Sequence, residues 1–101
     1  MGKNSNGNRA GVVSAFFAVV RGRVQGVGFR YSALHEAKRL GIKGWVRNAR
    51  DGNVEVWAEA HEDQLALFLR WLHKGPDHSH VESVKKEEKP PEGYSEFTVE
   101  Y

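Results

Sequence analysis

The sequence contains no cysteine among its 101 residues. A disulfide, a thiolate zinc site and a thiol nucleophile are therefore excluded, and the chain is compatible with a reducing compartment. No apolar run approaches the roughly 20 residues that a membrane-spanning helix needs, and no signal-peptide pattern opens the chain. We therefore expect a soluble, cytoplasmic protein without a membrane partner.

The length predicts one domain with a small but sufficient core. Residues 1–12 are polar and rich in glycine and asparagine, which predicts a disordered tail. Hydrophobic patterning begins directly after them, so we expect the folded domain to cover residues 13–101.

Charge is distributed unevenly, although the net charge is only +2. Residues 21–50 carry eight basic side chains and one acidic one, whereas residues 51–101 carry twelve acidic and five basic side chains. A basic segment favours an anionic partner. Charges that balance each other across a solvated surface would give the same pattern, so both interpretations stay open at this point.

Hydrophobic periodicity predicts two helices and a set of strands. The helices are expected over residues 30–40 and 62–74, and the strands over 14–23, 43–48, 53–59, 81–84 and 97–101, with a polar loop over 85–93. The strand over 53–59 alternates apolar and polar side chains and is expected to be half-buried. This order predicts an α+β fold, a ferredoxin-like split βαβ sandwich with two helices on one face of a mainly antiparallel sheet.

The segment between the first strand and the first helix is rich in glycine: Gly22, Gly26 and Gly28 lie within seven residues. Glycine lets backbone amides point inward together, and a helix N-terminus adds free amides and partial positive charge. Such a loop can hold a phosphate, with the Arg30 guanidinium closing over it. A tight turn whose glycines only allow close packing is the alternative.

The rest of the chain offers few groups for catalysis. His78 and His80 have a spacing that could bind a metal, but the residues suggest no third ligand, so a solvated loop is expected and neither a metal nor a cofactor is predicted. Phosphate chemistry would then depend on positioning and charge. Without a general acid, the leaving group must depart unprotonated, as a carboxylate does because its acid has a pKa of about 4. A mixed anhydride of carboxylate and phosphate fits this requirement.

Two motifs carry a resemblance to a known family. The stretch VRGRVQGVGFR at 20–30 is similar to the first signature of the acylphosphatase family, with every fixed position filled. The stretch GWVRN at 44–48, followed by Gly52 and Val54, resembles the second signature, which usually ends in glycine where this chain has Ala60. The resemblance extends over residues 14–101, so the predicted domain is identified as acylphosphatase-like.

This resemblance implies hydrolysis of acyl phosphates to a carboxylate and inorganic phosphate by a small monomer without metal or cofactor. Arg30 would hold the phosphoryl group, and Asn48 would orient the attacking water. The loop amides that assist Arg30 would be those of Gln25, Gly26, Val27, Gly28, Phe29 and Arg30 itself. Inorganic phosphate would act as product and inhibitor. From its position alone, Asn48 is a turn residue before a hairpin.

Two other functions are alternatives. A phosphate-binding module without turnover occurs in maturation proteins that carry a similar domain. An RNA-binding ferredoxin-like fold would suit the basic segment, but it needs an RNP pattern of aromatic residues that the sequence lacks. We therefore expect no nucleic-acid partner.

Overall fold

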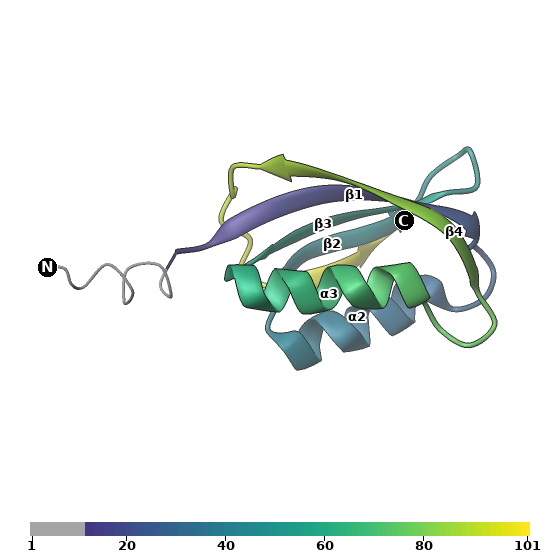
Figure 1. Cartoon of the computed structure of the whole chain (residues 1–101), viewed down its shortest axis with the longest axis horizontal. Coiled ribbons are helices and arrows are strands. Elements are labelled where there is room, and N and C mark those ends of the chain that lie inside the picture. The colour runs from purple at the N-terminus through teal and green to yellow at the C-terminus, as the bar shows by residue number, and fades with distance from the viewer. Residues whose placement is uncertain (1–11) are drawn as a thin grey trace, which may run out of the picture.

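The computed structural model describes residues 12–101, which fold into five strands and two helices. The elements are β1 (Ser14–Arg23), α2 (Phe29–Leu40), β2 (Lys43–Asn48), β3 (Val54–Ala60), α3 (Glu62–Lys74), β4 (His80–Lys89) and β5 (Phe97–Glu100). The strands form one sheet in the order β4-β1-β3-β2-β5, in which only the β2–β5 pair is parallel. Figure 1 shows both helices on one side of this sheet. The predicted ferredoxin-like fold is confirmed.

The core lies between the sheet and the helices. In β1, alternate side chains point toward the helices, and Phe16, Ala18 and Val20 are buried there. Helix α3 contributes Phe68 and Leu72, both fully buried, because apolar side chains recur on one face at helical spacing. This packing fixes the ends of β1 and α2 relative to each other. Neither helix among the described residues is long and apolar enough to cross a membrane.

Glycines and acidic residues mark the helix ends as the sequence predicts. Helix α2 begins at Phe29, one residue before the predicted start, and Gly41 in the left-handed conformation ends it. Helix α3 begins at Glu62, where His61 and Gln64 form a capping box. The predicted disordered tail of residues 1–12 lies outside the described residues, except for Val12, which is exposed.

The predicted loop over residues 85–93 is wrong in its first half. Strand β4 continues to Lys89, and its residues pair with β1 along nearly the whole length of that strand. Because β4 is the edge strand of the sheet, its outer side faces water, and charged side chains there cost little folding free energy. Its lysines and glutamates therefore gave no period-2 apolar pattern by which the strand could be recognised.

The prediction that β3 is half-buried is also wrong. Trp57 and Glu59, on the face away from the helices, are only 9% and 2% exposed. Trp57 lies between Phe17 of β1 and Trp45 of β2 in the sheet register, and its ring centroid is 6.5 Å from that of Tyr94. The open face of the sheet thus has a small aromatic cluster of its own, which covers the middle of β3.

Glu59 holds the segment between β4 and β5 against the sheet. Its carboxylate accepts hydrogen bonds from the Trp57 indole and from the backbone N–H groups of Glu92, Gly93 and Tyr94. Burial raises the pKa of Glu59, but these four bonds outweigh that effect and hold the pKa below its ordinary value. The buried carboxylate is therefore ionised at neutral pH and fully satisfied.

Candidate active site

The glycine at the end of β1 and the two that follow the strand have different functions in the backbone. A Cβ on Gly22 would lie 2.1 Å from the His80 carbonyl oxygen, so this glycine permits the close approach of β1 and β4. Gly26 and Gly28 have φ angles of 76° and 77°, and a Cβ on either would meet no atom within 4 Å. These two serve the left-handed backbone of an open loop, and close packing does not explain them.

The loop leaves backbone donors free next to a helix N-terminus. Within residues 12–101, the backbone N–H groups of residues 25–28 donate no hydrogen bond to the protein. Gly28 is the N-cap of α2 and provides no side-chain acceptor, and the first turn of the helix has no acidic residue. Unsatisfied N–H groups and the positive end of the helix dipole together make an anion-binding cradle.

Arg30 stands in the first turn of α2, beside this cradle. Its side chain is partly exposed, and in the described part of the chain it forms no ion pair with a carboxylate. Its Cζ atom lies 5.0 Å from the ring centroid of Tyr101 and 6.0 Å from that of Tyr31, within cation–π range. The two tyrosine hydroxyls are in hydrogen-bond contact with each other. The guanidinium is thus oriented by aromatic rings and free to bind an anion.

Asn48 ends β2 at the same end of the sheet. It pairs with the buried Val54 of β3, and because paired residues share a face, its side chain points to the helix side, where the loop lies. Strand β5 runs parallel to β2 with Glu100 opposite Arg47, so the next residues along the two strands are Asn48 and Tyr101. Figure 1 shows the β1–α2 connection, the β2–β3 hairpin and the C-terminus at this one end.

Two features near the loop were not predicted from the sequence. Tyr101 reaches Arg30 only because β5 joins the sheet beside β2, which no local pattern shows. The side chain of Gln25 donates to the carbonyl oxygens of Ala49 and Asn53, at 2.8 Å each, and ties the loop to the hairpin. The sequence predicts a role only for the backbone amide of Gln25, because the partners of its side chain lie 24 and 28 residues away.

A metal centre has no support among the described residues, in which no group of three histidine, aspartate or glutamate side chains converges. His78 and His80 are both exposed, as expected for solvated residues. The groups that this end of the molecule presents are free backbone amides, the Arg30 guanidinium and the Asn48 carboxamide.

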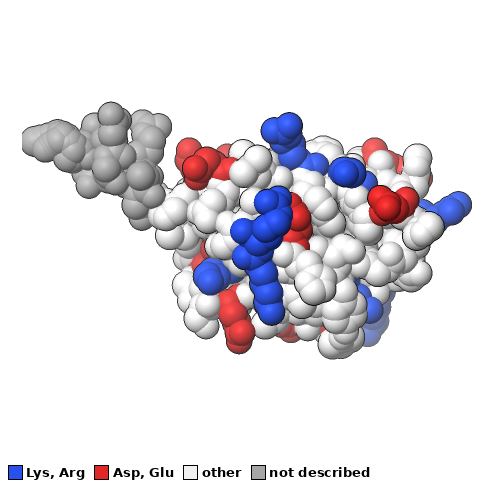
Figure 2. Space-filling model, turned by 90° about the horizontal axis from the view of Figure 1, so that it is seen from below, with Lys and Arg blue, Asp and Glu red and all other residues white. Residues whose placement is uncertain are grey.

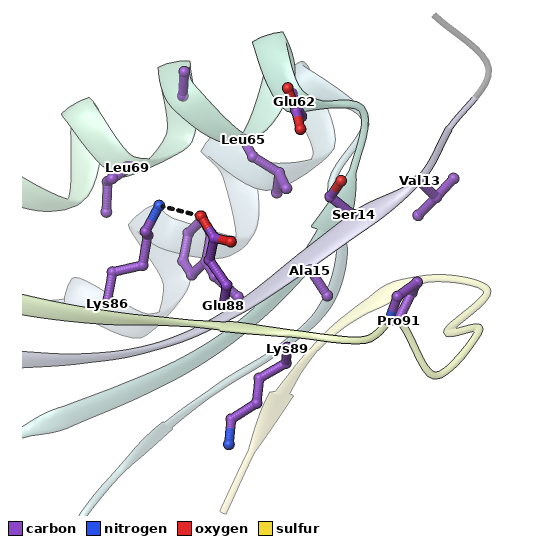
Figure 3. A pocket seen from close by; sticks show the side chains of 12 residues that line it. Val13, Ser14, Ala15, Glu62, Leu65, Leu69, Lys86, Glu88, Lys89 and Pro91 are labelled. Carbon is purple, nitrogen blue, oxygen red and sulfur yellow. Dashed lines mark ion pairs between the residues drawn. The ribbon is translucent and has the colours of Figure 1, made fainter. Parts of the chain in front are cut away.

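A hollow of about 440 Å³ lies between the first residues of β1, helix α3 and the end of β4, as Figure 3 shows with Val13, Leu65 and Pro91 on its walls. Its charged groups include Lys86 and Glu88, which pair with each other. The glycine-rich loop of residues 25–28 follows the other end of the ten-residue strand β1, roughly 30 Å away at about 3.3 Å per residue. This hollow is therefore separate from the candidate site.

The basic segment is partly neutralised by acidic neighbours. Arg39 pairs with Glu36 and Arg47 pairs with Glu55. Figure 2 shows lysine and arginine side chains on the face seen from below, with acidic side chains between them. Two of the eight basic residues in 21–50 are thus paired with carboxylates, while Arg30 forms no ion pair within residues 12–101.

This chain is similar to known proteins of one family. The family model described as Acylphosphatase matches residues 16–99. An acylphosphatase of Pseudomonas paraeruginosa is 51% identical over 82 residues, which cover 81% of this chain and 90% of the relative. The crystal structure of acylphosphatase from Bacillus subtilis has a TM-score of 0.85 at 37% identity and covers 89% of this chain and 100% of its own.

A second kind of protein shares the fold. The structure of full-length HypF in its phosphate- and nucleotide-bound form has a TM-score of 0.83 at 25% identity, over 89% of this chain but only 12% of that one. The matches that cover both chains decide the class, which is that of small enzymes acting on acyl phosphates. The chain belongs to the acylphosphatase family, and its activity is hydrolysis of an acyl phosphate to a carboxylate and phosphate.

Proposed function

We propose that Arg30 and the backbone amides of residues 25–30 bind the phosphoryl group of the substrate, and that Asn48 orients the attacking water. The observation that supports this most is the set of free N–H groups at the loop and helix start, beside a guanidinium without a carboxylate partner. Amides and a planar guanidinium offer several donors to the equatorial phosphoryl oxygens, where charge is spread in the transition state.

The reaction needs no covalent intermediate. The water oxygen bonds to phosphorus while the bond between phosphorus and the acyl oxygen breaks, and the electron pair leaves on the carboxylate. Both water protons end on the phosphate, so an acyl phosphate dianion and water give a carboxylate and dihydrogen phosphate. Because a carboxylic acid has a pKa of about 4, the leaving carboxylate needs no proton. Fixed donors that stabilise the phosphoryl oxygens are then sufficient.

Asn48 suits the placement of a neutral nucleophile. Its carboxamide oxygen can accept a hydrogen bond from water while its NH₂ group donates to a phosphoryl oxygen. Its side chain is exposed and has no hydrogen-bond partner within the described residues, so both the acceptor oxygen and the donor NH₂ group are free. A carboxylate in this place would repel the anionic substrate.

The proposal includes turnover without a metal or cofactor and competitive inhibition by inorganic phosphate. That the enzyme is a cytoplasmic monomer without a nucleic-acid partner stays a prediction from the sequence.

Benzoyl phosphate hydrolysis by the purified variants tests the assignment. Asn48→Ala is expected to lower kcat severely while phosphate still binds through Arg30 and the loop amides, whereas Asn48→Asp should lower both kcat and phosphate affinity. Asn48 would be a binding residue, and the water would be placed by another group, if Asn48→Ala lost phosphate affinity and kept kcat.

A further inference from the structure

The side chain of Gln25 joins two parts of the chain that the reaction needs together. Its Nε2 atom donates to the carbonyl oxygens of Ala49 and Asn53, both at 2.8 Å and in a partly buried position. We infer that Gln25 is a positioning residue: through these two bonds it fixes the β2–β3 hairpin, and with it Asn48, against the phosphate loop. This inference rests on the proposed function of Asn48.

The two carbonyl groups form the base of the hairpin. The Ala49 N–H donates to the Asn53 carbonyl at 2.8 Å, and the Gly52 N–H donates to the Ala49 carbonyl at 3.3 Å. Each of these oxygens therefore accepts one bond within the hairpin and one from Gln25. Gln25 thus binds the hairpin where its strands meet the turn, directly next to Asn48.

The geometry excludes a direct contribution of this side chain to anion binding through its donors. A carboxamide nitrogen has two hydrogens, and both are used by the two carbonyl oxygens. The backbone N–H of the same residue stays free on the loop. One residue therefore offers its amide to the phosphoryl group and holds the water-orienting strand end with its side chain.

Asn48 depends on such a restraint because its own side chain has no partner in the described part of the chain. Its position is set by the backbone at residues 48 and 49, to which Gln25 is bonded. A displacement of about 1 Å in a positioned group can cost on the order of 100-fold in rate. Losing the two bonds should thus act on the placement of water, and the phosphate cradle should stay intact.

Gln25→Met tests this because methionine keeps the length and removes the donors. We expect kcat for benzoyl phosphate to fall about 10- to 100-fold, with the phosphate inhibition constant changed less than about twofold. In the Asn48→Ala background the same substitution should change kcat less than about twofold, because the group it positions is already gone. Gln25→Lys, which keeps an N–H donor, should restore part of kcat.

Gln64→Met is the matched control. The Gln64 side chain also bridges two backbone segments, donating to Leu40 and accepting from His61, but at the opposite end of the sheet. Gln64→Met should lower the melting temperature and leave kcat unchanged.

Equal losses of kcat from Gln25→Met with and without Asn48 would overturn the inference, as would loss of phosphate binding in Gln25→Met. A normal kcat for Asn48→Ala alone would instead refute the proposed function.

If Gln25→Met does not fold, the Gln25→Lys variant carries the same comparison. In the presence of Asn48 it should be slower than the wild type but faster than Asn48→Ala, because lysine keeps an N–H donor for the carbonyl oxygens. A Gln25→Lys variant that folds but is no faster than the Asn48→Ala variant would also overturn the inference.

Discussion

Replacing Glu59 by glutamine is expected to destabilise the fold by about 2–6 kcal/mol, because two of its four N–H donors, which are buried or partly buried, lose their acceptor at about 1–3 kcal/mol each. The carboxylate accepts four hydrogen bonds, two on each oxygen. Glutamine keeps one oxygen and presents an NH₂ group where the other stood, so donors face donors there.

The melting temperature reports this loss. At about 4–8 °C for each kcal/mol in a domain of this size, Glu59→Gln should melt roughly 10 °C or more below the wild type. Glu82→Gln, which changes an exposed carboxylate on β4, should melt within about 2 °C of the wild type, as surface substitutions usually do. Activity at 25 °C should be little changed, since Glu59 lies at the end of the sheet away from the phosphate loop.

The pH dependence gives an independent check. Because the pKa of Glu59 is lowered in the folded state, its ionised form adds stability above the unfolded-state pKa of about 4.3, and this is lost as pH falls through the lower folded value. The difference in melting temperature between wild type and Glu59→Gln should therefore narrow below about pH 4. Equal melting temperatures at neutral pH would refute the account of Glu59 given above.

Three further results are expected. Arg30→Ala should abolish turnover and phosphate inhibition, since it removes a charge-assisted contact of at least about 1.5–3 kcal/mol, and more where charge gathers in the transition state. Arg70→Ala on the exposed side of α3 should keep both, and wild-type kcat in a folded Arg30→Ala protein would contradict this. Gly28→Ala should cost about 1–2 kcal/mol of stability in denaturant unfolding, because alanine is strained at a φ of 77°, and an unchanged midpoint would show that the loop adapts. Activity should survive exhaustive EDTA treatment, and loss that is restored by added zinc or magnesium would show a metal requirement.

Most of the fold was predictable because local signals agreed with one another. Strand β1 and strand β2 have the predicted bounds, and α3 begins and ends where acidic residues and Gly75 indicate. Local signals failed where a distant segment decides the outcome. The second half of β4 is a strand because β1 pairs with it, and Glu59 is buried because residues 92–94 fold over it.

The candidate site was predictable to a smaller extent. Arg30 and the loop came from a glycine pattern with a physical meaning, but Asn48 came from the family resemblance, and the roles of both stay predictions. The contact of Tyr101 with Arg30 and the bonds of the Gln25 side chain could not be predicted. They depend on how strands are ordered in the sheet, which periodicity does not encode.

The parallel pairing of β5 with β2 has a consequence for the order in which function appears during folding. The phosphate loop is built from neighbouring residues and can form once β1 and α2 pack together. Asn48 is placed only after β2 pairs with β3, and Tyr101 only after the last strand has docked beside β2. Loop closure over such separations slows folding, so contacts of high sequence separation are formed late. A chain in which β5 has not docked would keep the loop amides and Arg30 but would lack Tyr101 beside the guanidinium.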